Sequence, residues 1–214
     1  MRPTSYPFVP TMMLALAATA SSAGELRGDV SLGHSPGNPR AHVQDAVIWV
    51  EQIPDKTEHQ LTRTAFRWFW QRRDTVHLTR IVQSGRNYHP HVVALAAGSS
   101  LVIRNEDDVW HGPFSVSPTR GFDLGKLAPG RADTVSFDSA GVVAVRCDIF
   151  PDMSLFVVVT PNHAFTRPEE SGEWRLPDLP AGHYVVHAWH PDLGDSRREV
   201  DVPARGSVTL PLRW

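Results

Sequence analysis

Three residues in the second half of the chain have the types and spacing of metal ligands. They are His111, Cys147 and Met153, and the last two share one short segment, 147–153, with the sequence CDIFPDM. An imidazole, a thiolate and a thioether together favour a soft or borderline metal ion, above all copper. The chain has a single cysteine, so no internal disulfide competes for its sulfur. The sequence therefore predicts a candidate copper site at these three residues.

The elements that would position these ligands are strands. Short segments in which apolar and polar residues alternate recur along the chain, and turns rich in Gly, Pro, Asn and Asp separate them. Helical periodicity is hard to find, so the predicted fold class is all-β. The predicted strands are 25–31, 44–52, 75–83, 91–97, 100–105, 132–138, 141–147, 153–160, 173–177, 183–190, 196–202 and 206–212.

From Ile81 to about residue 160 the chain resembles the plastocyanin-like (cupredoxin) family, most closely proteins named methylamine utilization protein or plastocyanin. The resemblance rests on four stretches that match the family's motifs: Val82–Val92, Gly98–His111 with its N-x-D-x-x-x-H ending, Phe122–Gly125 and Gly141–Met153. It implies a β-sandwich with a type 1 copper site, in which two imidazoles and a thiolate form a plane and a thioether is the weak axial ligand.

One position departs from the family's pattern. Phe150 stands where the resemblance implies the second imidazole, and phenylalanine cannot bind copper. Three interpretations stay open. The site is degenerate, with Cys147 and Met153 as core residues. Alternatively, His111, Cys147 and Met153 bind Cu(I) on their own, or another histidine supplies the missing ligand.

His89 and His91 are the candidates for that additional ligand. A hairpin centred on Gly98 would pair strand 91–97 with strand 100–105, with their apolar residues facing the core. His89 and His91 would continue the same face toward the copper end of the sandwich. Asp107, Asp108 and Asp152 also lie near the candidate ligands and are expected to be solvated loop residues.

The two ends of the chain resemble another family, the prealbumin-like (carboxypeptidase regulatory) sandwich. The match lies in 170–184, where Trp174 and Tyr184 would anchor the core, and in the strands at 25–30 and 45–50. The predicted fold is thus a cupredoxin-like sandwich inserted in a prealbumin-like one, with a simple tandem arrangement as the alternative. The predicted segments are 1–23 (signal peptide), 24–53 (first prealbumin-like strands), 54–74 (linker), 75–160 (cupredoxin-like domain) and 161–214 (remaining prealbumin-like strands).

Composition and the N-terminal segment indicate where the chain works. Residues 1–23 have an early Arg2, an apolar run and then small residues, which is the order of a secretory signal. The apolar run is shorter than the roughly 20 residues that span a membrane. A formal net charge of −2 gives no reason to expect a nucleic-acid partner. We therefore expect a periplasmic protein that does not span the membrane.

The linker contains arginines interleaved with aromatic residues, from Arg63 to Arg73. It is expected to pack its aromatics on a sandwich, with partner docking or membrane contact as the alternative. The sequence shows no Ser-His-Asp order and no phosphate-binding glycine loop, so we expect no enzyme. The functional hypothesis is copper binding and electron transfer with a redox partner protein. The alternative is a metal-free binding or structural module.

Overall fold

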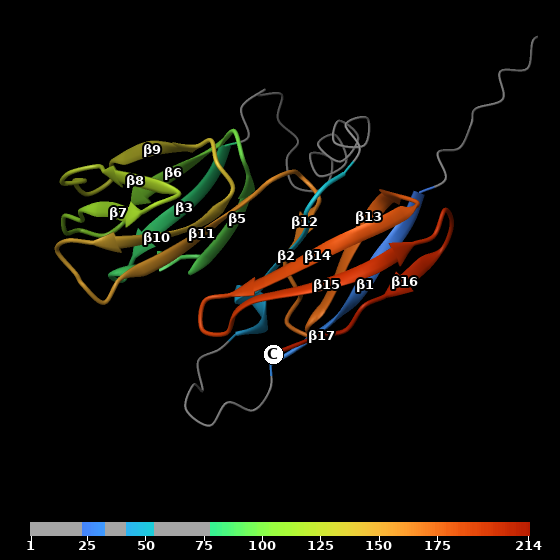
Figure 1. The fold of residues 1–214 in the computed structure, drawn as a ribbon. Helices are drawn as coiled ribbons and strands as arrows, with labels where there is room; N and C mark the ends of the chain where they lie inside the picture. The colour runs from blue at the N-terminus through green and yellow to red at the C-terminus, as the bar shows by residue number, and fades with distance from the viewer. Residues whose placement is uncertain (1–22, 33–41, 54–77) are drawn as a thin grey trace, which may run out of the picture.

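The computed structural model describes residues 23–32, 42–53 and 78–214, shown in colour in Figure 1. The predicted linker and all but the last residue of the predicted signal peptide lie outside the described residues. Within those ranges the regular elements are strands, apart from one 3-10 turn, η1 (Val43–Asp45). The predicted all-β class is confirmed. None of the described residues forms a helix of the length and apolar character needed to cross a membrane.

The central sandwich, defined here as β3 to β11, consists of two sheets (Figure 1). One sheet has the order β4-β3-β6-β9, and the other has the order β5-β11-β10-β7-β8. β3 runs parallel to β6 and β5 runs parallel to β11, whereas the other neighbours are antiparallel. The strands are β3 (Leu78–Ser84), β4 (Asn87–His89), β5 (Val92–Ala96), β6 (Ser99–Asn105), β7 (Pro113–Ser117), β8 (Arg120–Asp123), β9 (Ala132–Phe137), β10 (Gly141–Cys147) and β11 (Ser154–Thr160).

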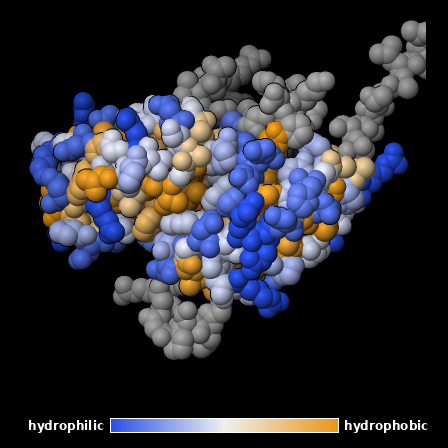
Figure 2. Space-filling view, viewed as in Figure 1, coloured by the Kyte–Doolittle hydropathy of each residue, from blue (hydrophilic) through white to orange (hydrophobic). Residues whose placement is uncertain are grey.

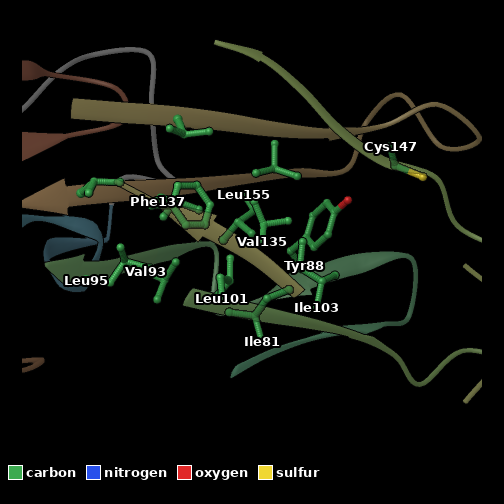
Figure 3. Close-up of a cluster of buried hydrophobic side chains, with 14 of the residues drawn as sticks. Ile81, Tyr88, Val93, Leu95, Leu101, Ile103, Val135, Phe137, Cys147 and Leu155 are labelled. Carbon is green, nitrogen blue, oxygen red and sulfur yellow. The ribbon is translucent and has the colours of Figure 1, made fainter. Parts of the chain in front are cut away.

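The core of the central sandwich lies between these sheets, where the inward side chains of each strand meet. Figure 3 shows apolar residues of both sheets pointing toward one another, with Leu95 near one end and Cys147 near the other. Cys147 and Met153 belong to this buried cluster and are 2% and 1% exposed. Two of the three candidate ligands are therefore part of the core.

The predicted hairpin around Gly98 is wrong. β5 pairs with β11, whereas β6 pairs with β3 and β9, so the two strands lie in opposite sheets. Gly98 has a φ of +86° and its backbone N–H donates to Phe137, in the sheet that the chain enters after the turn. The apolar residues of both strands still face the core, because the core lies between the sheets. Alternation predicts the buried face of a strand but not its neighbour.

The terminal sandwich combines strands from both ends of the described chain. Its sheets have the orders β13-β1-β16, with β17 also beside β1, and β12-β2-β14-β15. Trp174 and Tyr184, the expected core anchors, are 3% and 5% exposed. The chain thus leaves this sandwich after β2 and returns to it at β12. The strands are β1 (Ala23–Ser31), β2 (Val47–Val50), β12 (Phe165–Thr166), β13 (Glu173–Pro180), β14 (Gly182–His190), β15 (Gly194–Val202), β16 (Ser207–Thr209) and β17 (Leu212–Arg213).

The two sandwiches meet at an apolar junction with a polar margin. Val47 of the terminal sandwich packs with Val92 and Val158 of the central one. At the margin, the Arg167 guanidinium donates to the carbonyl of Gln44 and, at 2.8 Å, to the carbonyl of Val92. Arg167 therefore bonds to backbone on both sides of the junction, which fixes the central sandwich against the terminal one.

Candidate metal centre

The loop that carries His111 is organised by a buried amide. Asn105 ends β6 and is 0% exposed. Its Nδ2 donates to the carbonyls of Val109 at 2.7 Å and Leu127 at 3.0 Å, and its Oδ1 accepts from the backbone N–H of Asp107 at 2.9 Å. An isolated bridge between His111 and Leu127 closes the loop. These bonds satisfy the backbone of a non-strand segment and fix the position of the His111 ring.

His111 lies between a carboxylate and a thiol. Its side chain is 0% exposed, its Nε2 lies 2.8 Å from Asp107 Oδ2, and its Nδ1 lies 3.7 Å from Cys147 Sγ. An ionised carboxylate can only accept hydrogen bonds, so the ring carries its proton on Nε2. The lone pair on Nδ1 is then directed toward the Cys147 sulfur. This is the arrangement in which an outer carboxylate orients a metal-binding imidazole.

Asp107 is held in its ionised form by its neighbours. Burial acts to raise the pKa of Asp107, but hydrogen bonds from the backbone N–H of Arg86, from the His111 ring and from the backbone N–H of Gly85 lower this pKa below its ordinary value. The two backbone bonds measure 2.6 Å from Gly85 and 3.0 Å from Arg86. The expectation that Asp107 is a solvated loop residue is therefore wrong, because its side chain joins His111 to the turn between β3 and β4.

The Cys147 sulfur accepts a backbone hydrogen bond at the end of β10. Gly112 N–H donates to Sγ at 3.4 Å. A Cβ at residue 112 would lie 1.7 Å from Asp148 Oδ1, so a larger residue there would have to displace the exposed Asp148 side chain. The residue before Cys147 is also held, because the Tyr88 hydroxyl donates to the Arg146 carbonyl at 3.1 Å. Burial raises the pKa of Tyr88 well above its ordinary value, so the hydroxyl keeps the proton that it donates.

Met153 and Phe150 complete the late loop. Met153 N–H donates to the Phe150 carbonyl at 3.0 Å, which closes a tight turn. The Met153 side chain is buried in the same cluster as Cys147. The Phe150 ring is partly buried against this cluster, and its centroid lies 5.2 Å from that of the His111 ring at a tilt of 56°. Phe150, at the position where the resemblance implied a second ligand, therefore contacts His111, the candidate ligand histidine.

His89 and His91 are directed elsewhere. The exposed His89 has its Nε2 3.1 Å from the Ser84 carbonyl, and a cis peptide bond joins it to Pro90. The His91 ring lies at the junction, with Nδ1 3.3 Å from Asp45 Oδ2 and Nε2 3.4 Å from Ser154 Oγ.

The expectation that these histidines continue the core face of the strand is wrong. β5 begins only at Val92, and the residues before it do not follow the alternation of the strand. The structure brings His111 and Cys147 together and does not bring His89 or His91 to them.

Other donors are few around this pair. In the part of the chain that the structure describes, no group of three or more His, Cys, Asp or Glu side chains is arranged to hold a metal ion. The remaining donor predicted from the sequence is the thioether of Met153, which lies in the same buried cluster as Cys147.

Arg86 and Gly112 also contribute to the site and were not identified from the sequence. Nothing in the sequence pointed to Arg86, and the one sign of Gly112 was its position directly after His111.

Comparisons with known proteins place cupredoxins among the structural neighbours of part of the chain. No model of a protein family matches the sequence, and no curated protein matches it either. A Cu-containing nitrite reductase from Thermus scotoductus SA-01 is 23% identical over 38% of this chain and 22% of its own length, with a TM-score of 0.36. This chain thus spans about a fifth of that protein.

Two smaller proteins match over more of their own length. A mutant of amicyanin in the Cu(I) form is 17% identical over 42% of this chain and 86% of its own, with a TM-score of 0.37. A purple cupredoxin from Nitrosopumilus maritimus is 20% identical over 38% of this chain and 99% of its own, with a TM-score of 0.35. Likenesses at this level carry no information about metal or activity, which must be derived from the residues of the site.

Proposed function

We propose that the chain is an exported, cupredoxin-like copper-binding protein that holds Cu(I) through His111, Cys147 and Met153. The ion would be bound by Nδ1 of the imidazole, by the thiolate and by the thioether. The role is metal binding, with no catalysis by the chain itself. Export through the signal segment 1–23 and a periplasmic location are part of the same proposal.

The observation that carries the proposal is the arrangement of His111 and Cys147. An ion bonded to an imidazole nitrogen at ~2.0 Å and to a thiolate at ~2.3 Å, with an angle of about 110–120° between the bonds, separates the two atoms by about 3.5–3.7 Å. The distance from His111 Nδ1 to Cys147 Sγ is 3.7 Å. The donor atoms therefore already lie at the separation that a shared ion needs. The carboxylate of Asp107 also selects the tautomer that leaves Nδ1 unprotonated.

The donor set favours Cu(I) over Cu(II). Thiolate and thioether ligands select Cu(I), whereas Cu(II) is best held by additional nitrogen or oxygen donors. The position that would supply a second imidazole is filled by the Phe150 ring against His111. A hydrocarbon ring gives the ion no further bond and keeps water away from the ligands. The site thus fits an ion that is satisfied by three soft ligands.

The test is the affinity for Cu(I) in wild type and in Cys147→Ser, measured anaerobically by competition with a chromophoric Cu(I) chelator. We expect wild type to bind one equivalent. The serine variant should lose about 100-fold or more in affinity, because a neutral hydroxyl replaces the thiolate. Ser100→Ala, at the other end of β6, is the control and should bind as wild type. Equal Cu(I) binding by wild type and Cys147→Ser would overturn the proposal.

Electron transfer with a redox partner protein is the second candidate function. Trp110, the residue before His111, is 54% exposed and offers a contact surface beside the ligand. If this function is right, the bound copper should cycle reversibly between Cu(I) and Cu(II) in protein-film voltammetry. An irreversible loss of copper on oxidation would leave metal binding as the function.

A metal-free module remains the alternative from a different class. A 3.7 Å separation between Cys147 Sγ and His111 Nδ1 also suits a thiol that donates a hydrogen bond to the ring. In that case Cys147→Ser should leave the protein metal-free as before and change only its stability. The Cu(I) titration distinguishes the two functions directly.

A further inference from the structure

A strained turn places an arginine at the surface beside the candidate copper site. Gly85 and Arg86 connect β3 to β4 with φ angles of +60° and +58°. Glycine adopts this left-handed conformation freely, whereas an arginine does so only when its surroundings hold it there. Here Asp107 holds it, because its two carboxylate oxygens accept the backbone N–H groups of Gly85 and Arg86. Asp107 thus fixes the turn with the same carboxylate that orients His111.

The side chain of Arg86 lies over Phe150. The guanidinium carbon is 5.0 Å from the centroid of the Phe150 ring, which is the range of a cation–π contact. The Phe150 ring also lies against the His111 ring, at a centroid distance of 5.2 Å. Arg86, Phe150 and His111 therefore form a series from the surface to the ligand, and Asp107 binds both ends of it.

Phe150 is the part of this site that reaches solvent. His111, Cys147 and Met153 are 0%, 2% and 1% exposed, whereas Phe150 is only partly buried. The Phe150 backbone is fixed by its bond with Met153 N–H, so movement is left to the side chain. Rotation of the Phe150 ring away from His111 would also break its contact with Arg86.

We propose that Arg86 and Phe150 form a cover that controls how fast Cu(I) enters and leaves the site; this inference rests on the Cu(I) binding proposed above. The Phe150 ring of the cover lies against His111, so the cover must open before the ion enters or leaves, which slows uptake and release alike. It therefore governs exchange rates and leaves the equilibrium affinity nearly unchanged. An ion in such a site is retained until the cover opens, as suits a protein that passes copper on in a controlled way.

The test is the rate at which the full chain, loaded with Cu(I), releases the ion to excess chelator in a stopped-flow experiment. Arg86→Gly deletes the guanidinium and keeps the left-handed turn, which glycine adopts without strain. We expect release to be about 2–5-fold faster, the change that corresponds to loss of one exposed cation–π contact, while the dissociation constant stays within about 2-fold of wild type. Relief of the left-handed strain opposes the loss of the cation–π contact and the added entropy of the unfolded chain, so the melting temperature should stay close to that of wild type. Faster release at unchanged stability would then not arise from a loosened fold.

Two further variants complete the design. Arg86→Lys keeps a cation near the ring and should restore most of the slow release. Arg80→Gln removes an exposed arginine from β3, the strand that precedes the turn, and should release Cu(I) as wild type does. If Arg86→Gly releases Cu(I) at the wild-type rate while wild type binds the ion tightly, the cover is wrong and the proposed function stands. If wild type binds no Cu(I), the proposed function fails and the cover fails with it.

Discussion

Each of the two sandwiches contains a histidine paired with a carboxylate, and the two pairs have nearly the same length. His111 Nε2 lies 2.8 Å from Asp107 in the central sandwich, and His183 Nδ1 lies 2.9 Å from Asp201 in the terminal one. Their surroundings differ. The His111 side chain is 0% exposed, and its second nitrogen faces a sulfur. The His183 side chain is 58% exposed, and its second nitrogen faces another carboxylate, Glu199, at 3.6 Å.

The difference shows what turns a histidine–carboxylate pair into a candidate ligand. In the central sandwich one carboxylate takes the proton of the ring and leaves a lone pair directed at a soft donor, away from water. In the terminal sandwich carboxylates face both ring nitrogens, so the protonated ring is favoured and no lone pair is free for a metal. Figure 2 shows hydrophilic side chains gathered over β14 and β15, where water screens such pairs. The same histidine–carboxylate pair is thus a candidate metal ligand in one sandwich and a surface ion pair in the other. The difference comes from burial and from the group that faces the second ring nitrogen.

The largest expected effect comes from giving the buried pair the donor that it lacks. Phe150→His restores an imidazole at the position where the resemblance to cupredoxins implies one. We expect the variant to bind Cu(II) and to become intensely coloured through thiolate-to-copper charge transfer, whereas wild type with Cu(II) stays nearly colourless. The measurement is the visible spectrum during Cu(II) titration. The control is Phe150→Leu, which keeps an apolar side chain and adds no donor, and should not develop colour. A folded Phe150→His variant without colour would contradict the expected ligand geometry.

The next effect should come from removing the charge of the carboxylate in each pair. Asp107→Asn should lower the Cu(I) affinity about 10–100-fold, since an outer carboxylate fixes the tautomer and raises the basicity of a ligating imidazole. It should also cost about 1–2 kcal/mol in the free energy of unfolding, because the backbone N–H groups of Gly85 and Arg86 lose a charged acceptor. Both are measured by chelator competition and urea unfolding. Asp201→Asn, the equivalent change in the exposed pair, should leave the Cu(I) affinity unchanged. Equal effects from the two substitutions would contradict the distinction between the pairs.

A third change tests the remaining donor of the buried site. Met153→Leu nearly conserves the volume of a core side chain, so the free energy of unfolding should change by less than about 1.5 kcal/mol. The Cu(I) affinity should nevertheless fall, because leucine has no sulfur. If Met153 is only a core residue, Met153→Leu should leave the Cu(I) affinity unchanged. A loss of Cu(I) affinity that is larger than the change in the free energy of unfolding would identify Met153 as a ligand.

The smallest expected effect concerns the pH dependence of the exposed pair. The hydrogen bond with Asp201 raises the pKa of His183 from its ordinary 6.5, more than desolvation lowers it, and the charges of Asp201 and Glu199 raise it further. Because the folded protein favours the protonated ring, the pair stabilises the fold fully below pH 6.5 and loses this effect as the pH rises through the folded-state pKa. Urea midpoints of wild type and His183→Gln should therefore differ slightly at pH 5 and agree at pH 9. The difference should shrink in high salt. A difference between the two urea midpoints that grows with pH would contradict a raised pKa for His183.

Several features of the fold could be predicted from the sequence because they depend on local patterns. Alternation identified most strands and the buried faces of those that it found, as Leu95 and Leu101 show. The short strands β4, β7, β8 and β12 were missed, and the predicted strand 206–212 joined β16 with the first residue of β17. The missed strands are only two to five residues long, which leaves little alternation to recognise unless the pattern extends into the flanking residues, as it does around β2 and β5. The hairpin around Gly98 was wrong because strand pairing is a long-range choice that neither strand encodes alone.

The candidate site also has features that the sequence could predict and features that it could not. Residue types and spacing identified His111, Cys147 and Met153 as candidate ligands, because donor chemistry belongs to single side chains. They also identified Phe150 as the residue that departs from the family's ligand pattern. The sequence could not show that Asp107 orients the His111 ring, because a hydrogen bond at i and i+4 in a loop requires the conformation that buried Asn105 imposes. It also could not show that Arg86, 64 positions before Phe150 in the chain, would lie over the ring of that residue.

The sequence by itself thus determined the all-β class, the faces that are buried and the donor atoms available to a metal ion, because these follow from side-chain chemistry and short periodicities. Only the tertiary structure decided which sheet each strand joins and which donors meet. It directed His91 to the junction with Asp45 and brought His111 Nδ1 to Cys147 Sγ. The physical reason is that the direction of a side chain depends on where its backbone segment begins and on what packs against it. Both are set by contacts between residues that are far apart in the chain.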